Sequence, residues 1–113
     1  MRVLFFIVFV LISGVSFAGE FDGKYRLNKS WNCADVGSDG GAIMIDKGMF
    51  HGVESSCKMK KPTKVRDLDA TLYDIECSGE GTTWTNRMMI MRKNGGVFIL
   101  QKDSVGEWQR CPR

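Results

Sequence analysis

The chain has 113 residues, of which 43% are hydrophobic, and its 16 basic and 13 acidic side chains give a net charge of +3. This balance gives no argument for a nucleic-acid-binding protein, and the length allows one domain with a modest core. The chain contains four cysteines, Cys33, Cys57, Cys77 and Cys111, and a single histidine, His51. No set of catalytic groups stands out, so function has to be inferred from the expected fold and from one unusual loop.

The first 18 residues have the three parts of a secretory signal peptide. Arg2 supplies a positive charge, Val3–Ile12 is an unbroken apolar run, and Ser16-Phe17-Ala18 is a small-x-small cleavage site. The apolar run is too short to span a bilayer comfortably, and no cysteine follows the cleavage site to carry a lipid. We therefore predict that residues 1–18 are removed on export to the periplasm, which leaves 95 of the 113 residues as one domain, 19–113. An uncleaved anchor is the alternative.

The four cysteines are expected to form two disulfides, because an exported chain folds in an oxidising compartment. Three pairings are possible. We favour Cys33–Cys111, which ties the start of the mature domain to its last strand, together with Cys57–Cys77. In the chain-entropy model these bridges contribute about 4.5 and about 3 kcal/mol. A zinc site is the alternative, but the chain has no C-x-x-C pair and one histidine, so we expect no metal or cofactor.

Turn residues recur at short intervals along the mature chain, and the apolar runs between them are short, which is typical of β-strands. The expected strands cover residues 24–27, 41–45, 49–53, 70–77, 82–92, 97–101 and 105–111. Within the fourth of these, Asp74 and Glu76 lie on the face opposite Ile75 and Cys77. No segment keeps a helical period over three turns. We therefore predict an all-β fold, a small antiparallel β-barrel of seven or eight strands with two disulfides.

The densest basic segment, Lys58–Asp69, is predicted to be a solvated loop with room for one short helical turn. Its basic side chains are Lys58, Lys60, Lys61, Lys64 and Arg66; Pro62 interrupts the segment, and Asp67 and Asp69 follow. The functional alternative is electrostatic steering of the protein towards an anionic surface, such as cell wall or outer-membrane lipid.

Four consecutive apolar residues, Met88-Met89-Ile90-Met91, point to both faces of an expected strand. We favour a strand that crosses the core beneath a covering loop. The alternative is an adaptable apolar contact surface, because methionine side chains repack easily.

Catalytic chemistry finds little support in the sequence, so we expect a protein that is not an enzyme. His51 lies in an expected hairpin with no serine motif around it. The carboxylates available for a two-carboxylate glycosidase site are Asp67, Asp69, Asp74, Glu76 and Glu80. Such residues are common on exposed strand faces, and we favour solvated surface charges.

The most unusual segment is Cys77-Ser78-Gly79-Glu80-Gly81-Thr82-Thr83-Trp84, in which a glycine-rich loop links a half-cystine to an aromatic residue. Its two glycines allow the backbone a tight, protruding shape. An ordinary hairpin turn is one interpretation. The other is a preorganised loop, which would bind a protein groove with little loss of ordering entropy.

This segment resembles the protruding loop of the periplasmic and membrane-bound inhibitors of C-type lysozyme. Their loop has the pattern Ser-x-Ser-Gly-x-x-Tyr, between strands of a small disulfide-tied barrel. Ser78 matches the first serine and Gly81 the glycine, while Trp84 keeps an aromatic residue in place of the tyrosine. Glu80 replaces the second serine, and a carboxylate there would be repelled by the acidic cleft of a lysozyme. The chain is also similar in type to small exported inhibitors of peptidoglycan hydrolases.

The resemblance implies a protein whose partner is a peptidoglycan hydrolase, such as a lysozyme-like muramidase, and whose loop enters the cleft of that enzyme. Gly79 and Gly81 would let the loop enter, and Ser78 would hydrogen-bond the catalytic carboxylates. Trp84 would brace the loop or stack against a sugar subsite, and Arg87 would pair with an acidic cleft residue. Neither a nucleic acid nor a membrane anchor is expected after signal cleavage.

Two other functions are left open by the sequence. One is a lipocalin-like barrel that binds a small ligand or lipid beneath a lid at Gly37–Gly41, although so short a chain has little room for a large cavity. The other is a structural envelope protein that binds peptidoglycan through Trp31, Trp84 and Trp108.

Overall fold

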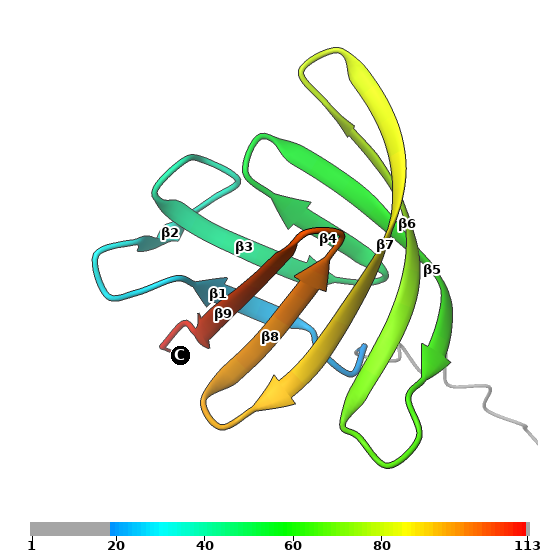
Figure 1. The fold of residues 1–113 in the computed structure, drawn as a ribbon. Coiled ribbons are helices and arrows are strands. Elements are labelled where there is room, and N and C mark those ends of the chain that lie inside the picture. The colour runs from blue at the N-terminus through cyan, green and yellow to red at the C-terminus, as the bar shows by residue number, and fades with distance from the viewer. Residues whose placement is uncertain (1–18, 113) are drawn as a thin grey trace, which may run out of the picture.

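The structure, a computed structural model, describes residues 19–112; the predicted signal peptide, 1–18, and Arg113 lie outside the described residues. Nine strands follow one another along the described part of the chain (Figure 1). They are β1 (Gly23–Arg26), β2 (Asn32–Val36), β3 (Gly41–Asp46), β4 (Met49–Gly52), β5 (Ser55–Lys64), β6 (Ala70–Gly79), β7 (Thr82–Lys93), β8 (Gly96–Gln101) and β9 (Ser104–Arg110). Residues 19–112 contain no helix that could cross a membrane.

Eight of these strands form a closed antiparallel barrel. From β3 to β9, each strand pairs with the next along the chain. β1 closes the barrel, because Tyr25 lies opposite Arg110 of β9 on one side and opposite Ile43 of β3 on the other. The remaining strand, β2, pairs in parallel with the start of β3 and is not part of the closed barrel. The predicted small antiparallel barrel is therefore confirmed, with eight strands.

Inward-facing side chains fill the barrel. The largest of the fully buried side chains are Phe21, Tyr25, Ile43, Ile75, Met88, Ile90 and Val97. In the methionine run, Met88 and Ile90 point into this core, whereas Met89 and Met91 stay half-buried on the other face of β7. The expected core strand is therefore present at this run, where β7 lies between β6 and β8; the covering loop stays a prediction.

The basic segment is a strand over much of its length, so the prediction of a solvated loop at Lys58–Asp69 is wrong as far as Lys64. This stretch belongs to β5 and pairs with β6. The side chain of Lys60 points outward and its Nζ lies 2.9 Å from Oε1 of Glu76 on β6. Acidic partners on the neighbouring strand compensate the basic side chains, which removes the reason to place them in a loop.

Pro62 does not end β5, because the strand is irregular where the proline sits. The register of β5 against β6 shifts between Lys60 and Thr63, and Lys61 in this interval has a φ of 50°. Pairing with β4 has already ended at Lys58, so the proline lies on a free edge. Proline is tolerated in sheets at such bulges and edges, since no ladder hydrogen bond is lost.

Both favoured disulfides are present. Cys33–Cys111 connects β2 to the residue after β9 across a sequence separation of 78, and Cys57–Cys77 connects β5 to β6 across a separation of 20. The described residues contain no free cysteine. Two disulfides in so small a domain are typical of proteins from oxidising, exported compartments.

Candidate functional site

The hairpin formed by β6 and β7 extends beyond the end of the barrel. β7 pairs with β6 from Thr82 to Met91, but its pairing with β8 begins only at Met88, opposite Gln101. The first half of β7 therefore has a strand on one side only. Figure 1 shows this hairpin standing clear of the β8–β9 hairpin. A protruding segment lies where the sequence leads us to expect one.

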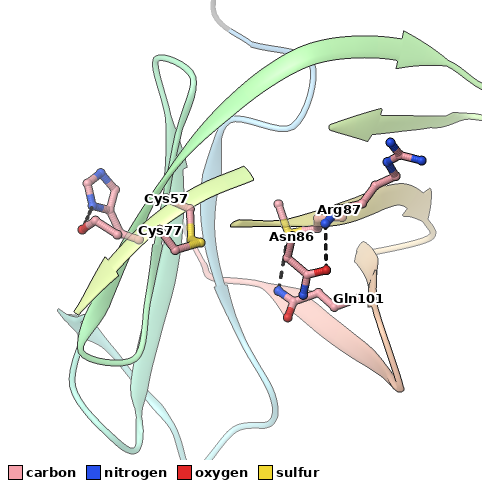
Figure 2. The surroundings of a disulfide bond; sticks show 8 residues. Cys57, Cys77, Asn86, Arg87 and Gln101 are labelled. Carbon is pink, nitrogen blue, oxygen red and sulfur yellow. Dashed lines mark hydrogen bonds between the residues drawn. A yellow bond between two sulfur atoms is a disulfide. The ribbon is translucent and has the colours of Figure 1, made fainter. Parts of the chain in front are cut away.

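A disulfide ties the outer half of this hairpin to β5. Cys57 and Cys77 are direct cross-strand neighbours whose Cα atoms are 3.9 Å apart (Figure 2). The same cross-strand row continues to Phe50 on β4 and to Trp84 on β7. The two cysteines are buried, whereas Trp84 is 42% exposed. The bridge therefore fixes the hairpin near its tip, directly beside an exposed aromatic side chain.

The tip of the hairpin is a two-residue turn formed by Glu80 and Gly81, whose φ angles are 50° and 77°. Two positive φ angles define a type I′ turn, for which asparagine, aspartate and glycine are the favoured residues. Gly79, just before the turn, lies against the β4–β5 turn. A Cβ atom on Gly79 would come within 2.5 Å of the carbonyl oxygen of Glu54. Only glycine allows the two turns to approach so closely.

The two turns bring two carboxylates together. Glu80 raises the pKa of Glu54, first through a hydrogen bond between the carboxyl groups and then through charge repulsion, with smaller contributions from burial and from Asp39. The ion pairs formed within residues 19–112 leave these three carboxylates without a cation. The tip of the hairpin is therefore acidic.

A groove of about 600 Å³ lies along the outer half of the hairpin, beside β4 and β5. Its polar side chains are those of Ser56, Lys58, Glu76, Ser78, Thr83 and Thr85. The strand register arranges them in two rows, because Ser56 lies opposite Ser78 and Lys58 lies opposite Glu76. A hydrogen bond from Lys60 lowers the pKa of Glu76, which keeps this carboxylate ionised at neutral pH. The groove thus presents four hydroxyl groups beside one ammonium and one carboxylate group.

Four of the predicted site residues share the outer half of the hairpin. Ser78 lies on the outer face and lines the groove, and Trp84 belongs to the inward-facing row on the next strand. Gly79 packs against the neighbouring turn, and Gly81 forms the tip. The structure therefore brings these residues into one segment, but Ser78 and Trp84 face opposite sides of the sheet.

Arg87, the fifth predicted residue, lies farther down β7 and already has a partner. Its Nε is 3.3 Å from Oδ1 of Asp74, and its main-chain N–H donates to Oδ1 of Asn86 at 2.8 Å. In Figure 2 its guanidinium group points away from the disulfide. Arg87 is therefore separate from the tip.

The sequence reasoning does not identify Glu54, Ser56, Thr83 or Thr85 as part of this site. Strand alternation places Thr83 and Thr85 on the same outer face as Ser78, once the turn position is known. Glu54 and Ser56 come from the β4–β5 hairpin, which carries no local sequence signal for contact with the β6–β7 turn.

The candidate catalytic groups are spread over the surface, and four of the five carboxylates are in ion pairs. His51 Nδ1 lies 3.4 Å from Oγ of Ser56, a long contact on the outer face. Among the carboxylates, Asp67 contacts Arg66, Asp69 contacts Arg92, Asp74 contacts Arg87 and Glu76 contacts Lys60. Within residues 19–112, no group of three or more His, Cys, Asp or Glu side chains is arranged to hold a metal ion.

The three tryptophans do not form one surface. Trp31 and Trp108 contact each other edge to face, with ring centroids 6.3 Å apart, and Trp108 packs against the core. Trp84 is on the protruding hairpin instead. Buried side chains occupy the middle of the barrel that a lipocalin-like ligand would need, and a pocket of about 320 Å³ remains beside Phe21, Ile45 and Tyr73.

No family model, curated protein or solved structure matches this chain. The functional interpretation therefore rests on the braced hairpin and on the groove along its outer half.

Proposed function

We propose that this chain is an exported, non-enzymatic binding protein that inhibits a peptidoglycan hydrolase of the lysozyme-like muramidase class. The β6–β7 hairpin would enter the active-site cleft of that enzyme. The observation that carries the proposal is that this hairpin extends past β8 and is braced near its tip by Cys57–Cys77. A rigid protruding segment loses little conformational entropy on binding. The match of Ser78, Gly81 and Trp84 to the inhibitor loop pattern adds support.

In this proposal the residues of the hairpin have separate tasks. Gly79 and Gly81 let the hairpin enter the cleft, and the turn formed by Glu80 and Gly81 comes to lie at the rim of the cleft. Ser78 donates a hydrogen bond to a catalytic carboxylate of the enzyme, and Trp84, on the other face, contacts the cleft wall or a sugar subsite. Arg87 already contacts Asp74. To pair with an acidic residue of the enzyme, its guanidinium group therefore has to bind both carboxylates at once.

The acidic tip restricts which hydrolases are suitable targets. Glu54 and Glu80 lie together without a cationic partner, and like charges across an interface are strongly unfavourable. A suitable enzyme therefore carries basic residues at the rim of its cleft, where these two carboxylates come to lie. Enzymes with an acidic rim are rejected. Glu80 thus sets target choice, although it departs from the inhibitor loop pattern.

A second candidate function, binding of peptidoglycan itself, is favoured by the groove. Ser56, Ser78, Thr83 and Thr85 present hydroxyl groups to it, beside the charged pair Lys58 and Glu76. Hydroxyl and charged groups on a rigid sheet suit the hydroxyl and amide groups of a glycan strand. In this case the chain is a structural protein of the cell envelope.

The clearing of a peptidoglycan suspension separates the two functions. Inhibition predicts that a stoichiometric amount of the exported protein slows clearing by at least one muramidase with a basic cleft rim. Unchanged clearing by a panel of muramidases at excess protein rejects the proposal. The control is sedimentation with insoluble peptidoglycan in the absence of enzyme. Co-sedimentation without inhibition favours the structural envelope protein.

Periplasmic location is part of the same proposal. The signal peptide pattern and the two disulfides support export to an oxidising compartment, which is where a peptidoglycan hydrolase would be met.

A further inference from the structure

The first described residues close the base of the barrel, at the end away from the β6–β7 turn. Phe21 is 1% exposed, and its carbonyl oxygen accepts a hydrogen bond of 2.7 Å from the hydroxyl of Tyr25. The guanidinium of Arg92 lies over the Phe21 ring, 5.3 Å from its centroid. The chain is therefore already part of the core three residues after Ala18.

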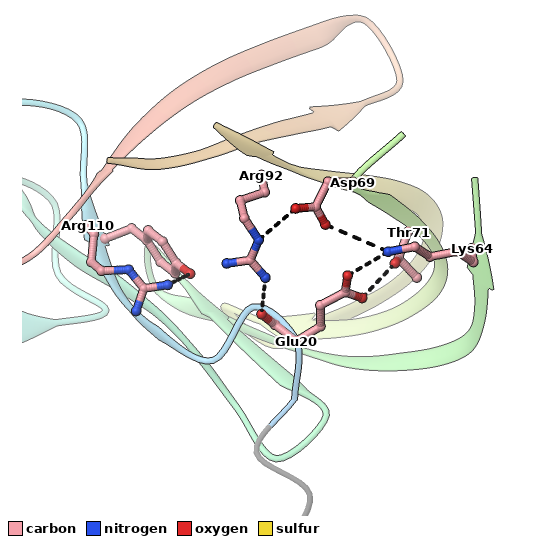
Figure 3. Close-up of polar contacts among 7 residues, drawn as sticks. Glu20, Lys64, Asp69, Thr71, Arg92 and Arg110 are labelled. Carbon is pink, nitrogen blue, oxygen red and sulfur yellow. Dashed lines mark hydrogen bonds and ion pairs between the residues drawn. The ribbon is translucent and has the colours of Figure 1, made fainter. Parts of the chain in front are cut away.

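Glu20 fixes the same segment to three strands (Figure 3). Its carboxylate accepts hydrogen bonds from Nζ of Lys64 at 2.7 Å and from Oγ1 of Thr71 at 3.1 Å. Its carbonyl oxygen accepts a bond of 2.7 Å from Nη2 of Arg92. The side chain of Glu20 is thus held by β5 and β6, and its main chain is held by β7.

Gly19 and Asp22 close a tight turn around these two residues. The N–H of Asp22 donates to the carbonyl oxygen of Gly19 at 3.1 Å, and the nitrogen of Gly19 donates to Oδ2 of Asp22 at 2.8 Å. A Cβ atom at position 19 would lie 2.6 Å from Oδ1 of Asp22. Glycine at position 19 therefore lets the carboxylate reach the nitrogen.

We infer that proteolytic removal of residues 1–18 completes this closure, and that Asp22 is the receptor for the α-ammonium group created on Gly19. An endopeptidase hydrolyses the peptide bond between Ala18 and Gly19. Water supplies the hydroxyl group of the new Ala18 carboxyl and a hydrogen to the Gly19 nitrogen, which takes up a further proton from solvent at neutral pH. A neutral N–H donor is thereby replaced by a charge-assisted one against the same carboxylate.

This inference does not depend on the proposed inhibitory function, because it concerns the opposite end of the barrel. It assigns a structural role to cleavage, beyond release of the chain from the export machinery. Cleavage at any other bond would leave the Gly19 nitrogen as an amide or remove it.

The first test is the mass of the full chain after export from an expressing cell. The predicted product begins at Gly19. A product that begins at any other residue overturns the inference.

The second test inserts one alanine between Ala18 and Gly19, so that the processed chain begins one residue earlier and the Gly19 nitrogen is an amide again. Intact mass verifies the start of each chain. Denaturant unfolding should show that the insertion lowers the folding equilibrium constant by about 2- to 5-fold, as for an exposed ion pair. In the Asp22→Asn background the insertion should have no effect. Equal stability with Asp22 present, or a loss that persists after Asp22→Asn, contradicts the inference.

Discussion

Cys57 and Cys77 face each other directly across β5 and β6, and their disulfide lies in the same cross-strand row as Trp84, close to the turn of the β6–β7 hairpin. At this level β7 has no contact with β8, whose pairing begins only at Met88. The bridge therefore ties the outer half of the hairpin to β5. We regard this bridge as the part of the molecule that makes the hairpin rigid enough to bind.

Removal of this bridge by Cys57→Ala with Cys77→Ala should lower the free energy of unfolding by about 3 kcal/mol. The barrel should stay folded, because Cys33–Cys111 still connects its ends. Hydrogen exchange should become faster in the hairpin than in the rest of the barrel, and inhibition of the hydrolase should weaken.

The matched control is Cys33→Ala with Cys111→Ala. It removes the longer bridge and should lower the free energy of unfolding by about 4.5 kcal/mol. Because this bridge does not touch the hairpin, the fraction of protein that remains folded should inhibit normally. Full inhibition by the first double variant, measured under conditions where it is folded, would count against the role of the hairpin.

Substitution of the two hairpin glycines should have different effects. Gly79→Ala places a Cβ atom 2.5 Å from the carbonyl oxygen of Glu54, so the two turns must separate. The free energy of unfolding should fall by about 1–3 kcal/mol. Gly81→Ala meets no atom within 4 Å and loses only about 1 kcal/mol through its positive φ. Urea unfolding and a hydrolase titration of both variants measure the difference. Equal losses of inhibition would show that the contact between the turns is irrelevant to binding.

Glu80→Asn should stabilise the protein, because asparagine is favoured where the turn requires a positive φ. The backbone contribution is about 1 kcal/mol. The substitution also removes the carboxylate that raises the pKa of Glu54. Thermal unfolding at neutral and acid pH measures both effects.

The pH dependence of this gain has a defined sign. Glu54 binds its proton more tightly in the folded chain than in the unfolded chain, so stability falls as the pH rises from its ordinary pKa of 4.5 through the raised folded pKa. Glu80→Asn should therefore raise the stability of the protein more at neutral pH than at acid pH. A gain that is the same at neutral and acid pH would mean that the two carboxylates do not interact.

The sequence predicts well those features of the fold that depend on local residue patterns. Alternation in residues 70–77 places Ile75 and Cys77 inward and Glu76 outward, as the structure has them. The Ser78–Trp84 segment forms the hairpin turn that its glycines indicate, because turn chemistry is a local signal; its role in binding stays a prediction.

The remaining features depend on contacts between distant segments. β5 looks like a loop until Glu76 and Asp74 are seen on the neighbouring strand, opposite Lys58 and Lys60. The acidic tip requires Glu54 and Glu80 to meet, although they lie on two separate turns. No pattern within either segment indicates that the two carboxylates lie close together.

Glu20→Gln should destabilise the base of the barrel by about 1 kcal/mol, since its side chain is 36% exposed and solvent screens part of the interaction. The hydrogen bond from Lys64 lowers the pKa of Glu20. Its stabilising contribution is therefore complete above the ordinary pKa and is lost as the pH falls through the lowered one. The difference in unfolding free energy between Glu20→Gln and the unsubstituted protein should thus shrink in acid.

A suitable control for this substitution is Glu76→Gln. Its partner Lys60 also lowers a carboxyl pKa, but both side chains are about half exposed, and Lys58 adds only a smaller effect through its charge. A smaller effect on unfolding is expected there. An equal effect would show that the closure at Glu20 adds nothing beyond a surface ion pair.

The most direct test of the central claim is a titration of a susceptible muramidase with the exported protein, compared with its Trp84→Ala and Val105→Ala variants. Both side chains are exposed, at 42% and 70%, so neither truncation should unfold the barrel. Trp84 lies on the hairpin and Val105 on β9. We predict stoichiometric inhibition that is weakened at least about 30-fold by Trp84→Ala, as for an interface hot spot, and is unchanged by Val105→Ala. Inhibition that survives Trp84→Ala unchanged, or no inhibition by the unsubstituted protein, would contradict the proposal.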